Sequence, residues 1–179
     1  GRRELAEMLN HHFRLAEPMR RAVEALAMDL LGDRPTLGVH YRGTDKRTEA
    51  PAVSHAEMFE AMRRELRADP EIERIFVATD SHAFREALGD AFEGRDVRSA
   101  PDVQRSSDET GVHFLGHGDP VEKAREALVD ALLLGRCRRL VKTESALSHW
   151  TSLLHPGLPV TQVNAPYRPP AWAAWFPLA

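Results

Sequence analysis

The stretch Thr36-Leu37-Gly38-Val39-His40-Tyr41 is short and apolar, and it predicts a buried β-strand. The polar segment 42–53 follows, and the capping box Ser54-His55-Ala56-Glu57 then begins an amphipathic helix. The same order of strand and helix recurs along the chain. The later predicted elements are strands over 74–80, 96–98, 139–143 and 158–163 and helices over 81–92, 119–134 and 144–154. Such alternation is typical of right-handed crossovers, so the sequence predicts an α/β, Rossmann-like three-layer sandwich around a mainly parallel sheet.

The predicted domain occupies residues 36–165. Residues 1–35 are predicted to form a helical lead-in of one or two helices, the second beginning at Pro18. The tail 166–179 contains four prolines and is expected to be extended or disordered. A chain of 179 residues can bury roughly 70% of its unfolded surface in one core, whereas two complete nucleotide-binding domains need about twice that length.

Composition excludes several classes of protein. The 24 basic and 27 acidic residues are interleaved and give a net charge of −3, which argues against nucleic acid as the main partner. No apolar run is long enough to span a bilayer, and the first residues do not resemble a signal peptide, so we expect a cytoplasmic location if the source is bacterial. Because the chain starts at Gly1 without Met, we also expect natural residues upstream.

The chain has one cysteine, Cys137, which excludes an internal disulfide and a cysteine-based zinc site. It lies between two arginines at a predicted helix-to-strand junction, where we expect no nucleophilic role. His113 and His117 have a spacing that could hold a metal on a helix, but the glycines around them predict a loop. Trp150, like the tryptophans of the tail, is expected to serve packing.

Polar side chains follow the predicted strands at their carboxyl ends, where ligands of open α/β sheets bind. Arginine, lysine, hydroxyl groups and helix-start amides are the groups that hold phosphates. Neither GxGxxG nor GxxxxGK[ST] is present, so the sequence does not support a dinucleotide dehydrogenase or a P-loop protein. The candidate residues are His40, Arg42, Thr44, Asp45, Lys46 and Glu49 after the first strand, Thr79, Asp80 and Ser81 after the second, and Thr143, Ser145 and Ser148 after the fourth.

Three motifs in register resemble those of the α1,6-fucosyltransferases and their relatives, the protein O-fucosyltransferases. The first is Gly38-Val39-His40-Tyr41-Arg42-Gly43-Thr44-Asp45-Lys46 followed by Thr48-Glu49-Ala50. The second is the strand Phe76-Val77-Ala78-Thr79-Asp80. The third combines Leu128-Val129-Asp130-Ala131-Leu132-Leu133-Leu134 with Leu140-Val141-Lys142-Thr143-Glu144-Ser145-Ala146. The resemblance extends in order from about His12 to Asn164.

This resemblance implies the donor-binding, C-terminal half of a two-domain GT-B glycosyltransferase. The implied reaction transfers fucose from GDP-fucose to a glycan or peptide-linked hydroxyl, with inversion at the anomeric carbon and without a metal or other cofactor. The implied partner is an N-terminal acceptor domain, for which 179 residues leave no room. Two other interpretations stay open: a non-catalytic nucleotide-binding module that needs a partner domain, or a transferase that uses another nucleotide sugar.

The resemblance also implies residue roles. Arg42 would hold the β-phosphate, although it could instead be an ordinary loop arginine. His40 and Asp130 would bind guanine, although His40 could be a core histidine and Asp130 could belong to a water-facing helical stripe. Asp80 would bind the donor or cap the next helix. The hydroxyl residues implied at the donor site are Thr143, Ser145 and Ser148.

Glu49 is implied to deprotonate the acceptor hydroxyl, with Lys46 as its neighbour, although Glu49 could instead be a solvated loop carboxylate. Asp45 is expected to pair with Arg42 or to fix the loop through backbone N–H groups. The chain departs from the family pattern in this loop, which is one residue shorter and has Gly43 where paired-arginine enzymes carry a second arginine. Ser81 and Ala146 are further departures, each replacing a polar residue of the pattern.

Overall fold

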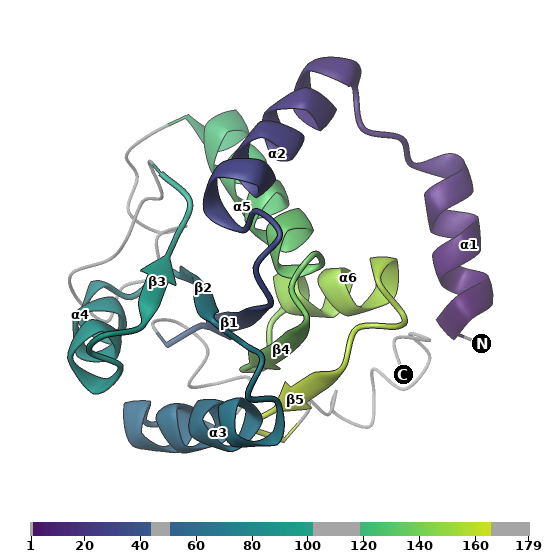
Figure 1. Ribbon diagram of the computed structural model, residues 1–179. Helices are drawn as coiled ribbons and strands as arrows, with labels where there is room; N and C mark the ends of the chain where they lie inside the picture. The colour runs from purple at the N-terminus through teal and green to yellow at the C-terminus, as the bar shows by residue number, and fades with distance from the viewer. Residues whose placement is uncertain (1, 44–50, 102–118, 166–179) are drawn as a thin grey trace.

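The computed structural model describes residues 2–43, 51–101 and 119–165 (Figure 1). The predicted alternation of strands and helices is confirmed in this part of the chain, and the first segment holds two helices. The helices are α1 (Arg2–His12), α2 (Glu17–Leu30), α3 (His55–Ala68), α4 (His82–Ala91), α5 (Pro120–Leu134) and α6 (Ala146–Leu154). The strands are β1 (Thr36–Tyr41), β2 (Arg74–Thr79), β3 (Asp96–Arg98), β4 (Arg139–Lys142) and β5 (Val160–Gln162).

The strands form one parallel sheet in the order β3-β2-β1-β4-β5. In its register His40 of β1 lies between Ala78 of β2 and Lys142 of β4, so these three strands end at nearly the same level. β2 and β3 lie on one side of β1, and β4 and β5 lie on its other side. The strand order therefore switches between β1 and β4. The predicted α/β sandwich with a mainly parallel sheet is confirmed.

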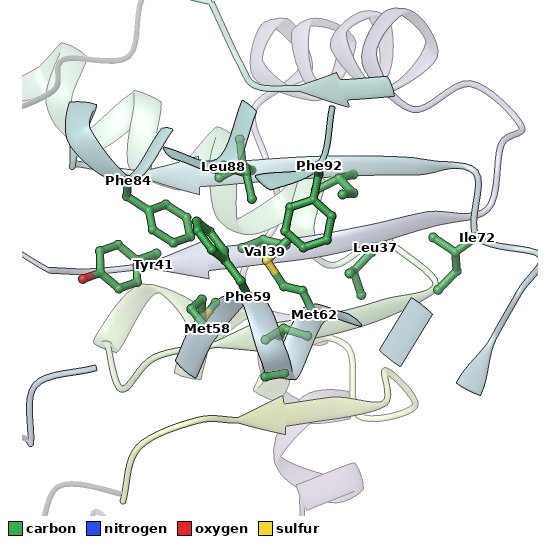
Figure 2. Close-up of a cluster of buried hydrophobic side chains, with 14 residues drawn as sticks. Leu37, Val39, Tyr41, Met58, Phe59, Met62, Ile72, Phe84, Leu88 and Phe92 are labelled. Carbon is green, nitrogen blue, oxygen red and sulfur yellow. The ribbon is translucent and has the colours of Figure 1, made fainter. Parts of the chain in front are cut away.

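One face of the sheet is covered by α3 and α4 (Figure 1). Alternate residues of β1 point to this side, because successive side chains of a strand face opposite ways. The aromatic rings gather here: Tyr41 stacks on Phe84 with 4.0 Å between ring centroids, and Phe59 lies against both Phe84 and Phe92 (Figure 2). This cluster is formed by Leu37, Val39, Tyr41, Met58, Phe59, Ala61, Met62, Ile72, Ile75, Val77, Phe84, Leu88, Phe92 and Val141.

The other face is covered by α2, α5 and α6, and the helical lead-in therefore contributes to the core through α2 (Figure 1). A close approach lies at Gly38, where an added Cβ would stand 3.1 Å from Cys137 and 3.2 Å from Leu134. Glycine at this position lets α5 pack tightly onto β1. The second cluster is formed by Val23, Ala27, Leu30, Leu31, Phe76, Ala78, Ala100, Val129, Leu133, Leu134, Cys137 and Leu140.

The helix starts follow the predicted local signals, with one exception. Ser54 and Glu57 form a complete capping box, and Asp119 caps α5 ahead of Pro120. The last helix begins at Ala146 rather than at 144. Residues 143–145 instead form a non-helical connector, which is bonded to His40 of β1, to Asn164 and to Ser148 and has an extended backbone at Ser145. The last strand is also shorter than predicted, spanning Val160–Gln162.

Within the described ranges, no helix combines the length and apolar character needed to cross a membrane. The tail 166–179 and the predicted loop with His113 and His117 lie outside the described residues. The proposed domain boundaries stay a prediction.

Candidate nucleotide-sugar site

The carboxyl ends of β1 and β4 are joined directly by hydrogen bonds. The Thr143 N–H donates to the carbonyl of His40 at 3.0 Å, and the Arg42 N–H donates to Thr143 Oγ1 at 2.9 Å. Thr143 is 2% exposed, so its hydroxyl serves this joint rather than the solvent. The joint lies at the switch in strand order, which is where open α/β sheets form their ligand crevice.

Arg42 projects from this joint and is held by an acidic partner from β2. Its Nε lies 3.6 Å from Asp80 Oδ2, and the two side chains are only 16% and 14% exposed. Asp80 does not cap the following helix, because Ser81 accepts the hydrogen bond from the Phe84 N–H. The expectation that Asp80 caps this helix is therefore wrong, and the structure places its carboxylate beside the guanidinium of Arg42.

His40 and Asp130 lie on the same side of the sheet. Leu134 of α5 packs over Gly38. As the return crossover of a parallel sheet, α5 runs antiparallel to β1, so Asp130, one turn before Leu134, lies level with His40, two residues beyond Gly38. Both side chains are buried, at 5% and 6% exposure, and both make contacts within the protein. The water-facing alternative for Asp130 is therefore wrong, while its guanine-binding role stays a prediction.

The connector 143–145 leads into the amino terminus of α6. Ser145 is the N-cap residue and is 2% exposed, but its side chain makes no capping hydrogen bond. Ser148 is fully buried, and its hydroxyl lies 3.3 Å from the carbonyl oxygens of Thr143 and Ser145. The Ser148 hydroxyl therefore bonds to carbonyl groups at both ends of the connector 143–145. Amide groups at the start of α6 and the positive end of its dipole face the carboxyl edge of the sheet.

A pocket of about 500 Å³ opens between α5 and α6 beside Arg42. Trp150 is 47% exposed on its wall and therefore does not belong to the buried core, while packing against the tail lies outside the described residues. A sequence signal for it existed, because Trp150 shares a helix face with Ala146, at the start of the third motif's helix. The described residues that line the pocket are Arg42, Ala127, Leu128, Ala131, Ser145, Ala146, Leu147 and Trp150.

The predicted base and its neighbours, Asp45, Lys46 and Glu49, lie in 44–50, outside the described residues. The structure does explain the departure at Gly43. A Cβ at this position would stand 2.5 Å from Cε1 of Tyr41, whose ring stacks on Phe84 and whose hydroxyl donates to Val53 O at 3.0 Å. A larger residue at position 43 would therefore have to displace a ring that is fixed in the core.

Asn164 joins two segments of the site and was missed by the sequence analysis. Its Oδ1 accepts from the Glu144 N–H at 2.7 Å, and its Nδ2 donates to Pro51 O at 3.1 Å. Gln162 reinforces the connection by donating to Glu144 Oε2 at 2.8 Å. The Asn164 side chain thus links Glu144, in the connector before α6, to Pro51, which directly follows residues 44–50. No sequence pattern marks such a link between residues 113 positions apart.

Cys137 is buried, and burial raises the pKa of its thiol far above its ordinary value. A thiol that stays protonated is a poor nucleophile, as the sequence predicted. Among the described residues, no group of three or more His, Cys, Asp or Glu side chains has a metal-binding arrangement. A metal-independent reaction stays a prediction.

The folded chain was compared with known proteins. No family model and no curated protein sequence matches it. Solved structures do match, each over 84% of this chain. Fucosyltransferase NodZ from Bradyrhizobium matches at 23% identity with a TM-score of 0.57, and the match covers 46% of the NodZ chain. POFUT1 in complex with GDP matches at 13% identity with a TM-score of 0.56, and the match covers 47% of the POFUT1 chain. NodZ α-1,6-fucosyltransferase soaked with GDP-fucose matches at 24% identity, with a TM-score of 0.57 and 46% of its length covered.

These likenesses show the fold. The chain has the architecture of one part of the fucosyltransferase structures, and it spans less than half of their length. The resemblance noted in the sequence motifs and the likeness of the fold therefore lead independently to the same group of proteins.

Proposed function

We propose that this chain is the nucleotide-sugar-binding part of a glycosyltransferase and that its donor is GDP-fucose. Two lines of support converge. The fold is shared with structures of POFUT1 in complex with GDP and in complex with GDP-fucose. The motifs that resemble those of the fucosyltransferases also include Arg42, Asp80 and Ser145, which follow β1, β2 and β4 at the carboxyl edge of the sheet.

The position of Arg42 carries the proposal. This arginine lies at the switch in strand order, is oriented by Asp80 at 3.6 Å, and lines the pocket together with Ser145 at the start of α6. A planar guanidinium and a helix amino terminus are complementary to a diphosphate. The low exposure of the Arg42–Asp80 pair strengthens this electrostatic effect, because solvent screens it less.

The proposed chemistry is an inverting displacement. The acceptor oxygen attacks the anomeric carbon of fucose, the bond from that carbon to the β-phosphate oxygen breaks, and GDP leaves with the electron pair. Arg42 would stabilise the negative charge that grows on the diphosphate, an interaction that is stronger in the transition state than in the bound donor. Glu49 would take the acceptor proton with Lys46 beside it, and no metal is required in this scheme.

The length of the chain favours a second candidate function. Because the chain spans less than half of the similar structures, it could bind a nucleotide sugar without turning it over until an acceptor domain completes the site. A third candidate, transfer from a uridine-based donor, differs only in the base.

Calorimetric titration of the chain with GDP and with UDP tests the proposal. We expect GDP to bind in preference to UDP, and Arg42→Ala to weaken GDP binding about 10-fold or more, because a hydrogen bond to a charged group contributes about 1.5–3 kcal/mol. Arg67→Ala is the matched control, since Arg67 lies on α3 and pairs with Glu60.

Equal affinity for GDP and UDP would contradict the donor assignment. An Arg42→Ala variant that binds GDP as well as the parent chain would contradict the phosphate role of Arg42. Absence of GDP binding by the parent chain would contradict its function as a donor domain by itself.

A further inference from the structure

Glu144 belongs to the third motif, but the resemblance implies no role for it. Its backbone N–H donates to Asn164 Oδ1 at 2.7 Å, and its Oε2 accepts from Gln162 Nε2 at 2.8 Å. The same Gln162 nitrogen donates to the carbonyl of Asn164 at 3.0 Å, so both hydrogens of this amide are used. Among the described residues, none donates to Glu144 Oε1. Glu144 is therefore a partly buried carboxylate that is held by β5 and keeps one oxygen for a ligand.

The strand order places Glu144 on one side of Arg42 and the predicted base contacts on the other. Arg42 follows β1 and is joined to Thr143 of the connector after β4. His40 lies on β1, and Asp130 lies on α5, which packs against β1 and β2. Glu144 follows β4 and is bonded to the β5 side of the sheet (Figure 1). Because the diphosphate separates the base from the sugar in a nucleotide sugar, a diphosphate at Arg42 directs the sugar toward Glu144.

A contact on the acceptor side of the reaction leads to the same place. Asn164 holds the Glu144 N–H with its Oδ1 and donates from its Nδ2 to Pro51 O at 3.1 Å. Pro51 comes two positions after Glu49, the proposed base. In a direct displacement the attacking hydroxyl and its base must lie beside the anomeric carbon of the sugar. The sugar therefore belongs near the junction of Pro51, Asn164 and Glu144.

We propose that Glu144 binds the sugar of the donor, with its Oε1 accepting a hydrogen bond from a fucose hydroxyl and with Gln162 as the residue that positions it. This inference rests on the proposed function, because Arg42 fixes the diphosphate. Fucose linked through C1 keeps hydroxyls at C2, C3 and C4, each of which can donate. An ionised carboxylate only accepts, and such charge-assisted hydrogen bonds are stronger than neutral ones.

Calorimetry with GDP and with GDP-fucose tests the contact, because the two ligands differ only in the sugar. Glu144→Ala should weaken GDP-fucose binding about 10-fold or more, since a hydrogen bond to a charged group is lost. Glu144→Gln keeps an acceptor for Gln162 but removes the charge, so its loss should be smaller, about 3- to 10-fold. GDP affinity should not fall in either variant. Glu60→Gln is the matched control, because Glu60 pairs with Arg67 on α3.

Deoxy donors identify the hydroxyl group that Glu144 binds. Among GDP-fucose analogues that lack the hydroxyl at C2, C3 or C4, one should bind the parent chain as weakly as GDP-fucose binds Glu144→Ala. That analogue should lose no further affinity in the variant, because both changes remove the same contact. Gln162→Leu should weaken GDP-fucose binding but not GDP binding, and it should add little to Glu144→Ala. Circular dichroism checks that each variant is folded.

The outcomes separate this inference from the proposed function. GDP-fucose binding that is unchanged in Glu144→Ala would overturn the sugar contact and leave the donor site intact. Equal weakening of GDP and GDP-fucose would also overturn it, because Glu144 would then order the connector rather than bind the sugar. A parent chain that binds no GDP would overturn both proposals.

Discussion

Arg42 owes its position to contacts from distant parts of the chain. Its backbone N–H is bound by the Thr143 side chain, and its guanidinium lies 3.6 Å from Asp80. A charged pair that is mostly shielded from water is costly to leave incomplete. The side chain is therefore restrained before any ligand arrives, and a restrained cation loses less conformational entropy when it binds an anion.

We expect base selectivity to depend on the buried carboxylate Asp130. A carboxylate can accept both the N1–H and the N2 amine of guanine, whereas an amide side chain offers one acceptor and one donor group. Asp130 lies on the same side of the sheet as His40 and is 6% exposed, so solvent competes little with such a contact.

Asp130→Asn tests that selectivity. We expect about a 10-fold or larger loss of GDP affinity, and loss of the preference for GDP over inosine diphosphate, which lacks the N2 amine. Calorimetry with both nucleotides measures this, and Glu122→Gln, an exposed site on the same helix, is the control. Unchanged discrimination between the two nucleotides in Asp130→Asn would contradict a guanine contact at this position.

At the level of secondary-structure elements, the connector 143–145 is the part of the site that local propensity does not explain. The sequence analysis extended α6 back to 144, yet the helix begins at Ala146. The amide of Thr143 bonds to β1, the amide of Glu144 bonds to Asn164, and Ser145 has an extended backbone (φ −166°, ψ 146°), so helical geometry begins only at Ala146. The delayed start places Ser145 at the pocket.

Asn164 is expected to hold two segments of the site together. Asn164→Ala should accelerate amide hydrogen exchange both in 143–146 and in 52–54, with little change in overall stability. Asn164→Asp keeps the acceptor for the Glu144 N–H but loses the donor to Pro51 O, so it should accelerate exchange only in 52–54. Mass spectrometry of the corresponding peptides separates the two cases.

The Asn164→Ala variant also tests whether the link through Asn164 contributes to GDP binding. GDP binding should weaken several-fold in Asn164→Ala, because the connector beside Arg42 is then less ordered. Ser152→Ala is a suitable control, since its hydroxyl bonds only within α6. Exchange that stays at parent rates in both segments would show that the link through Asn164 does not order them.

At the scale of the whole molecule, the sheet and its two covering layers form a complete core. Buried clusters lie on both faces, and the candidate site lies at one edge. Both clusters are formed by residues of this chain, and the pocket beside Arg42 lies between α5 and α6. This fits a chain that spans less than half of the structures it resembles.

We therefore expect the chain alone to bind GDP but to transfer no fucose from GDP-fucose to oligosaccharide acceptors. Transfer needs a positioned acceptor hydroxyl, and orientation of two reactants accounts for a large share of catalysis. Product analysis by mass spectrometry, with release of GDP measured in parallel, tests this. Fucosylated product formed by this chain without any added domain would show that it is a complete transferase.

Much of this architecture could be predicted from local patterns. The capping box at Ser54, the start of α5 at Asp119 and the apolar run of β1 each depend on residues close together in the sequence. The placement of Arg42, Asp80 and Thr143 at one edge also followed, because parallel strands end at the same side of a sheet. The errors arose where distant contacts overrode local preference, as at the start of α6.

The amino-acid sequence was sufficient for the order of the elements, the parallel sheet and the edge at which polar side chains gather, since these depend on short-range periodicity and on the handedness of crossovers. Folding in three dimensions was needed to pair Arg42 with Asp80, to bury Asp130 and His40 and to form the pocket that Trp150 lines. These features depend on strand register and on the packing of α5 and α6. Neither can be calculated from neighbours along the chain, because the contacting residues are tens of positions apart.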